Sequence, residues 1–176
     1  MSEADRPESP SPELSRMVDR RHITTRPVRI EADEAERAAL ARRFALVSIG
    51  HLQAELALVV EGERVTATGR LQAAIVQSCA ISGDDLPVTI DEELRLFFVP
   101  EQKIEVEELE LEEDDLDQLF YTGTSFDLGE AVAQSLALAI DPYACGPEAD
   151  RVREEAGLNA PAATGPFAAL AALQKK

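Results

Sequence analysis

Polar and apolar residues alternate on both sides of a short glycine turn, and this pattern restricts the fold more than any other feature. The apolar positions are Leu52, Ala54, Leu56, Leu58 and Val60 before the turn at 61–63, and Val65, Ala67, Leu71, Ala73 and Ile75 after it. Successive side chains of a strand point to opposite faces, so this alternation predicts strands that bury one face. Two such runs around a Gly-containing turn predict an antiparallel hairpin.

A third long strand is expected after a second turn at 82–85. The alternation resumes there with Val88, Ile90, Leu94, Leu96 and Phe98. A fourth, shorter strand would include Ile104 and Val106. In the second strand, Gly69 falls at a position where the alternation places apolar residues. A glycine within a strand predicts a bulge or a bend there.

A helix is expected before this sheet. Asp33 and Glu36 have the spacing of a capping box, which predicts a helix that runs to about Phe44. Leu40 and Phe44 should face inward, and the arginines at 37, 42 and 43 should face mostly solvent.

A second capped helix is expected after the sheet. Asp127 and Glu130 repeat the capping-box spacing, and Pro142 disfavours helical geometry at the preceding residue. Between them runs the apolar stripe Leu128, Val132, Leu136 and Ile140. The predicted fold class is α+β, an antiparallel β-sheet meander of long strands with a helix before it and a capped helix after it.

The ends of the chain differ in composition from this domain. Residues 1–15 are rich in Pro, Ser and Glu, which predicts a disordered tail. Residues 16–146 form the predicted α+β domain. Residues 147–176 are predicted to be an Ala/Pro-rich linker followed by a short helix with Phe167, Leu170 and Leu173 on one edge.

The charge of the chain is strongly asymmetric. The net charge is −17, and residues 1–50 contain nine basic and nine acidic side chains, so the excess lies in residues 51–176. Such a body repels phosphate backbones and attracts cationic proteins.

No run of apolar residues is long enough to span a membrane, and the N-terminus lacks the apolar region of a signal peptide. Cys79 and Cys145 lie 66 residues apart, which makes a disulfide framework unlikely, so we expect a cytoplasmic protein with no membrane partner.

An acidic run at 105–117 is the main candidate for partner binding. Its carboxylates are Glu105, Glu107, Glu108, Glu110, Glu112, Glu113, Asp114, Asp115 and Asp117. They could form a solvated edge that discourages strand pairing, a landing site for a basic protein, or a divalent-cation site, although EF-hand spacing is absent. Acid–base catalysis by carboxylate pairs is a further alternative.

A basic segment at 16–29 offers the candidates for RNA contact, which are Arg16, Arg20, Arg21 and Arg26. No aromatic residue is interleaved with these arginines, so base stacking is not indicated. The alternative is that the segment is held against the acidic body of the same molecule.

The sequence predicts no metal, no cofactor and no catalytic residue. Cys79 and Cys145 are isolated from each other, and His22 and His51 are the only histidines, so the ligand pairs of a zinc site are missing. Phosphate-binding loops, nucleophile elbows and His-Glu-x-x-His motifs are also absent.

Four stretches carry a resemblance to a known family: ELSRMV near the start, the helix EADEAERAALARRFAL, the stretch GRLQAAIVQSCAISGDDLPVTIDEELRLFF, and the block SFDLGEAVAQSLALAIDPYAC. Over roughly residues 13–146, the chain resembles the YceD family of large ribosomal RNA subunit accumulation proteins. The motif positions are Cys79, Asp127, Leu128, Gly129, Glu130, Asp141, Pro142 and Tyr143. Many relatives carry a second Cys where this chain has Ser82, and its absence resembles the branch seen in alphaproteobacteria.

This resemblance implies a non-enzymatic role in the accumulation or maturation of large-subunit ribosomal RNA. In bacteria, the family's gene commonly lies beside one for a small ribosomal protein of the large subunit. We expect the acidic surface to bind a basic ribosomal protein of the large subunit or a pre-ribosomal particle. Direct binding of rRNA through residues 16–29 is the first alternative, and a hydrolytic enzyme with clustered carboxylates is the second.

Overall fold

The computed structural model describes residues 12–101 and 118–157. These residues belong to two compact units. The first contains the described residues of 12–77 and 87–141, and the second contains residues 78–86 and 142–157.

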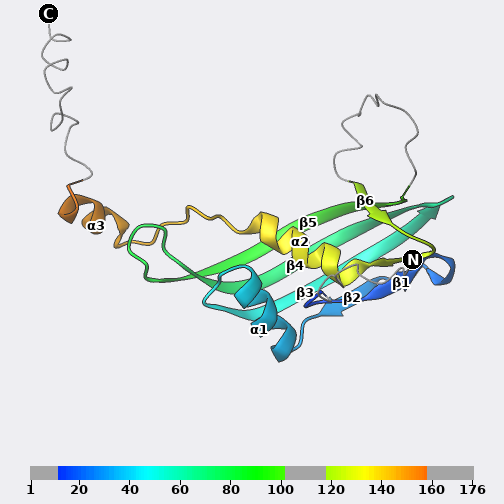
Figure 1. Cartoon of the computed structure of the whole chain (residues 1–176), viewed down its shortest axis with the longest axis horizontal. Helices are drawn as coiled ribbons and strands as arrows, with labels where there is room; N and C mark the ends of the chain where they lie inside the picture. The colour runs from blue at the N-terminus through cyan, green and yellow to red at the C-terminus, as the bar shows by residue number, and fades with distance from the viewer. Residues whose placement is uncertain (1–11, 102–117, 158–176) are drawn as a thin grey trace, which may run out of the picture. The chain divides into compact units, whose positions relative to one another are not determined.

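Three long strands form the centre of the first unit (Figure 1). They are β3 (Ser48–Glu61), β4 (Arg64–Ser78) and β5 (Asp85–Pro100), in a sheet of order β2-β3-β4-β5-β6. The outer strands are the short β2 (Val28–Glu31) and β6 (Gln118–Tyr121). β2 is antiparallel to β3 and β3 to β4, whereas β6 runs parallel to β5. The predicted meander of three long strands is therefore confirmed, and the predicted strand at Ile104 and Val106 lies outside the described residues.

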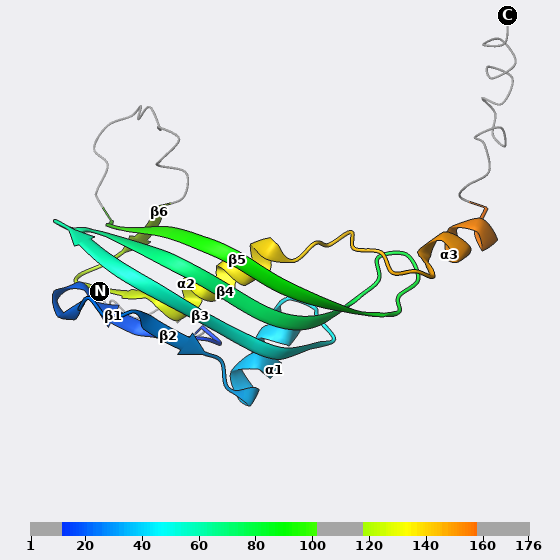
Figure 2. The same ribbon diagram turned by 180° about the vertical axis from the view of Figure 1, so that it is seen from behind.

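The alternation of the sequence separates the two faces of this sheet. Leu52, Leu56 and Leu71 are completely buried, and they lie on the face that helices α1 (Glu34–Arg43) and α2 (Leu128–Ala139) cover. Figure 2, viewed from behind, shows the strands in front of both helices. The two helices contribute Leu40, Leu128, Val132 and Leu136 to the same core. The α+β fold class is confirmed.

A second, two-stranded sheet holds the N-terminal part of the chain. β1 (Met17–Asp19) is antiparallel to β7 (Ser125–Asp127), and the short 3-10 helix η1 (Arg20–His22) follows β1. Leu14, just before β1, has no exposed surface and belongs to the core. The predicted disordered tail of 1–15 is thus wrong for residues 12–15, because an apolar side chain in this polar segment is buried.

The caps of the two helices differ. The Asp33 side chain accepts a hydrogen bond from the Glu36 backbone N–H at 2.8 Å and Glu36 returns one at 2.9 Å, so the predicted capping box of α1 is confirmed. Asp127 caps α2 as predicted, by accepting from the N–H groups of Gly129 and Glu130. The reciprocal half of that second box is not formed, because both Glu130 carboxylate oxygens accept from Arg43 instead.

Gly69 does not introduce a bulge into β4. The register between β3 and β4 is continuous there, with Gly69 opposite Leu56, and the shift occurs between Ile49 and His51. A Cβ atom on Gly69 would instead lie 2.9 Å from the Leu56 Cα and would overlap the Glu55 carbonyl oxygen. Gly69 therefore permits a close approach of two backbones, which is the second use of glycine in a strand.

The second unit consists of the turn between β4 and β5 and the chain after α2. It contains a short helix α3 (Ala149–Glu155), in which Ala149 is buried. The linker predicted from residue 147 onward is therefore helical at 149–155. The predicted C-terminal helix with Phe167, Leu170 and Leu173 lies outside the described residues. Among the described helices, none is long and apolar enough to cross a membrane.

The contact at Gly69 yields a test of the fold. Gly69→Ala should lower the free energy of unfolding by about 2 kcal/mol or more, because overpacking against backbone atoms forces the strands apart. Gly50→Ala is the control, since a Cβ atom there would meet its nearest neighbour, the Ala74 carbonyl oxygen, at an ordinary 3.7 Å. Urea unfolding followed by circular dichroism measures both variants, and equal stability of the two would contradict the proposed contact.

Candidate functional site

The Asp127 carboxylate joins the N-terminal segment to helix α2. Its Oδ1 accepts from the backbone N–H groups of Arg16 at 2.8 Å, Gly129 at 3.0 Å and Glu130 at 3.1 Å. Its Oδ2 accepts from the Ser15 hydroxyl at 2.6 Å. One side chain thus caps a helix and fixes a segment more than a hundred residues earlier in the sequence, so this motif position organises the core.

Gly129 is required by the same contact. A Cβ atom at this position would lie 2.8 Å from both the Arg16 nitrogen and the Leu14 carbonyl oxygen. The N-terminal segment can therefore pass directly over the first turn of α2, with the Leu14 side chain buried.

The neighbouring motif residue Glu130 connects α2 to α1. Arg43 donates to the two carboxylate oxygens of Glu130 at 2.7 and 2.9 Å and to Glu13 at 2.9 Å. Hydrogen bonding by Arg43 lowers the pKa of the Glu130 carboxyl. Arg43 is exposed, as expected, and it also links three segments of the chain.

The RNA-contact candidates are divided among different partners. Arg16 forms a two-point ion pair with Glu36 at 2.6 and 3.0 Å, and Arg20 donates to Glu63 at 2.9 Å beside the turn between β3 and β4. Arg21 pairs with Asp19 at 2.6 Å. Arg26 is exposed, and no ion pair of its guanidinium is found within the described ranges. The structure does not gather these four arginines into one cluster.

The end of α2 carries the remaining motif positions. Helix α2 ends at Ala139, and the Asp141 carbonyl oxygen accepts from the buried side chain of Gln77 at 2.8 Å. This bond fixes the chain to β4 directly after the helix. Pro142 and Tyr143 begin the second stretch of the other unit, and the Tyr143 side chain is 82% exposed.

Cys79 lies in the second unit as a buried thiol that accepts backbone hydrogen bonds. The Ser82 N–H lies 3.4 Å and the Gly146 N–H 3.3 Å from its sulfur. Hydrogen bonding by Ser82, through its side chain and its backbone, and by the N–H groups of Gly146 and Ile81, lowers the pKa of the Cys79 thiol to about 6. Cys145 is exposed, and both thiols are free.

Two further candidates from the sequence are a metal site and the acidic run at 105–117. Across residues 12–101 and 118–157, no three His, Cys, Asp or Glu side chains group as ligands of a metal ion. The acidic partner-binding candidates from Glu105 to Asp117 lie outside the described residues.

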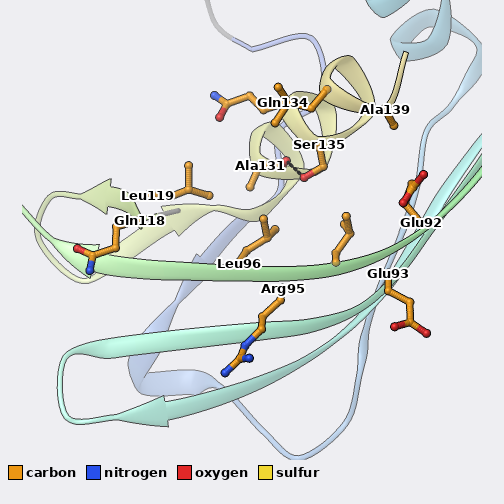
Figure 3. A pocket seen from close by; sticks show the side chains of 12 residues that line it. Glu92, Glu93, Arg95, Leu96, Gln118, Leu119, Ala131, Gln134, Ser135 and Ala139 are labelled. Carbon is orange, nitrogen blue, oxygen red and sulfur yellow. Dashed lines mark hydrogen bonds between the residues drawn. The ribbon is translucent and has the colours of Figure 1, made fainter. Parts of the chain in front are cut away.

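A groove of about 490 Å³ runs between β5 and α2 (Figure 3). Five consecutive residues of β5, 92–96, form one wall, and Ala131, Ser135 and Ala139 from α2 form the other. Leu119 of β6 lies at one end of the groove, and the rim residue Leu138 is 89% exposed. The lining includes the apolar residues Leu94, Leu96 and Leu119, and the Glu92 carboxylate lies at the end of the groove near Ala139.

The family model of YceD, the large ribosomal RNA subunit accumulation protein, matches residues 67–174, which is more than half of the chain. The chain belongs to the YceD family. Searches of curated proteins and of solved structures return no match. The name of the YceD family implies a role in accumulating large-subunit rRNA. Members of this family are not known as enzymes.

The YceD match includes the whole groove and all eight motif positions, but it leaves out residues 16–66 with the basic segment. Sequence reasoning missed the groove because it followed the large apolar residues of α2. The signal that could have located it is the small residues Ala131, Ser135 and Ala139 at four-residue spacing, which leave space beside a neighbouring strand.

The Asp127 contacts predict a large effect of a small change. Asp127→Ala should lower the free energy of unfolding by about 2 kcal/mol or more, because it removes a helix cap and also leaves the Arg16 N–H unpaired. Trypsin should then cleave after Arg16 faster. Asp33→Ala removes only the cap of α1 and should cost about 1 kcal/mol without this cleavage. Equal cleavage rates in the two variants would contradict the role of Asp127 in holding residues 15 and 16.

The lowered pKa of Cys79 predicts a pH-dependent contribution to stability. The folded thiol loses its proton at about pH 6, whereas an unfolded Cys does so at about pH 8.5. Between these values the unfolded state binds more protons, so the stability of the protein relative to Cys79→Ser should rise with pH and be fully present above the unfolded pKa. Ultraviolet thiolate absorbance in a Cys145→Ser background should show a transition near pH 6, and a transition near pH 8.5 would contradict the assignment.

Proposed function

We propose that this YceD-family chain is a non-enzymatic, cytoplasmic factor that supports accumulation or maturation of 23S rRNA by binding a basic protein of the large ribosomal subunit. The role in rRNA accumulation is supported by the family assignment, since the YceD family is named for accumulation of the large ribosomal RNA subunit. We further propose that the chain belongs to the alphaproteobacterial branch of the family, because it has Ser82 where many relatives carry a second Cys.

The second half of the proposal rests on charge. The net charge is −17, and 34 carboxylates oppose only 17 basic side chains. Three of the four arginines considered for RNA contact are paired with carboxylates of the same chain, which reduces their availability to phosphates. Repulsion between an acidic body and phosphate acts over a Debye length of about 8 Å at physiological salt, whereas a cationic protein is attracted over the same range.

Within this proposal, residues 105–117 are the principal contact for the cationic partner. Nine carboxylates in this run follow the end of β5 and precede β6 along the sequence. Residues 16–146 would form the YceD-like α+β domain that carries out this function.

Neutralising part of the acidic run tests the partner. Glu112→Gln, Glu113→Gln, Asp114→Asn and Asp115→Asn together should weaken binding to purified basic large-subunit ribosomal proteins at least about tenfold, since each exposed ion pair contributes up to about 1 kcal/mol. The matched control removes the same charge from the exposed residues Glu34, Glu55, Glu61 and Glu154. Equal losses in both variants would contradict a localised site, and no complex with any of these proteins would contradict the proposal.

A pair of arginine substitutions distinguishes direct RNA binding from binding to a basic protein. Arg26→Gln with Arg42→Gln removes two exposed cations for which the described part of the chain shows no ion pair, so the fold should be unaffected. If the partner is a protein, co-sedimentation with immature large subunits should persist in this variant. Binding of the purified chain to naked rRNA fragments that is lost in this variant would favour the alternative.

A further inference from the structure

Among the residues that the structure describes, strand β5 has a free backbone edge beside helix α2. Its pairing with β6 extends from Phe97 to Pro100, and no strand within the described ranges pairs with the same edge between residues 87 and 96. Five consecutive residues, 92–96, line the groove, although alternate side chains of a strand point to opposite faces. The groove therefore also meets backbone atoms of β5. On the edge opposite β4, the N–H and C=O groups of residues 87–96 have no strand partner within the described ranges, so this edge can accept an added strand.

The floor of the groove is apolar and only partly covered. Leu94 and Leu96 are half-buried, in contrast to the completely buried Leu52 and Leu56 of β3, and Figure 3 shows Leu96 directed toward α2. Leu138 on the rim is 89% exposed. An added strand could cover Leu94 and Leu96 with its inward side chains, and it could pack against Leu138 at the same time.

Charge specifies the kind of strand that fits. Glu92 is exposed at the end of the groove, and no cation of the described ranges pairs with it. The last turn of α2, which ends beside it at Ala139, contains no basic residue, so the partial negative charge of the helix C-terminus is not compensated. Arg95 directs its guanidinium away from the groove, 5.2 Å from the centroid of the Phe97 ring. This end of the groove therefore favours a cation.

We propose that the groove between α2 and β5 binds an extended cationic peptide, which adds to the free edge of β5 as a strand and places a Lys or Arg beside Glu92. Main-chain hydrogen bonds would supply affinity and the alternate side chains would supply specificity, as in other complexes formed by strand addition. The inference rests on the proposed function in one respect, because the peptide would come from a basic tail of a large-subunit ribosomal protein.

Two other occupants are less compatible with these charges. The chain's own acidic run at 105–117 would bring nine carboxylates toward Glu92, and a second copy would bring acidic β5 residues against each other if it paired edge to edge. A cationic strand meets neither repulsion.

A synthetic heptapeptide, Lys-Val-Arg-Val-Lys-Val-Arg with a fluorescent label, tests the groove on the full chain by anisotropy. Glu92→Gln should weaken binding about three- to fivefold and reduce its salt dependence, because one exposed ion pair is lost. Leu138→Asn should weaken it about fivefold through the lost apolar contact. The same peptide with alternate amides N-methylated should bind at least about tenfold more weakly, because it cannot pair with the strand edge.

Glu61→Gln is the matched control for charge, since Glu61 is exposed at the turn between β3 and β4, away from the groove. Equal effects of Glu61→Gln and Glu92→Gln would overturn the proposal, as would undiminished binding of the N-methylated peptide. A dimer of the free chain that Leu138→Asn dissociates would assign the groove to a second copy and would also overturn it.

The same variants separate this inference from the proposed function. A ribosomal-protein complex that Glu92→Gln and Leu138→Asn leave unchanged would retain the function and refute the groove. Binding of the heptapeptide with the expected losses, without any ribosomal-protein complex, would retain the groove and refute the function.

Discussion

The fold depends on one carboxylate that serves two distant parts of the chain. Asp127 ends β7, caps α2 and accepts hydrogen bonds from Ser15 and Arg16, so the first described residues and the second helix are fixed together. This contact brings Leu14 into the core and leaves no room for a side chain on Gly129. Hydrogen bonds to a charged acceptor are stronger than neutral ones, and four of them converge here. The motif that carries the family resemblance is therefore explained by architecture, and no reaction needs to be assigned to it.

The fixed position of α2 determines the surface beside it. Leu128, Val132 and Leu136 turn into the core, so Ala131, Ser135 and Ala139 lie toward β5, and their small side chains leave a groove along the edge of the strand. β6 covers only the last part of that edge. A long unpaired edge invites pairing with other chains, and proteins commonly protect such edges with charge. Glu92 and Glu93 can have this protective effect against like-charged or neutral strands, and they leave the edge open to a cationic strand.

The sequence predicted the architecture well because period-two alternation and helix caps are local signals. Leu52 to Phe98 identified three strands, and Asp33 with Glu36 identified α1. Long-range contacts were not predictable in the same way. Glu130 had the correct spacing for a capping box, yet Arg43 from another helix competes successfully for its carboxylate. Leu14 lies in a segment of disorder-prone composition and is nevertheless buried, since a single apolar contact does not change the composition of a window. Gly69 was recognised as unusual, but only the register shows that it permits a close backbone approach and forms no bulge.

The arrangement of the arginines connects the fold to the proposed partner. Arg16, Arg20, Arg21 and Arg43 each pair with a carboxylate of the same chain, and together they link the N-terminal segment, both helices and the turn between β3 and β4. A phosphate backbone would have to compete with these pairs and with the field of a body of net charge −17. A cationic peptide faces no such competition, because the carboxylate of Glu92 is not paired with any cation of the described residues. The internal use of the positive charges thus leaves unpaired negative charge at the surface, and this is the physical reason to expect a protein partner in preference to naked RNA.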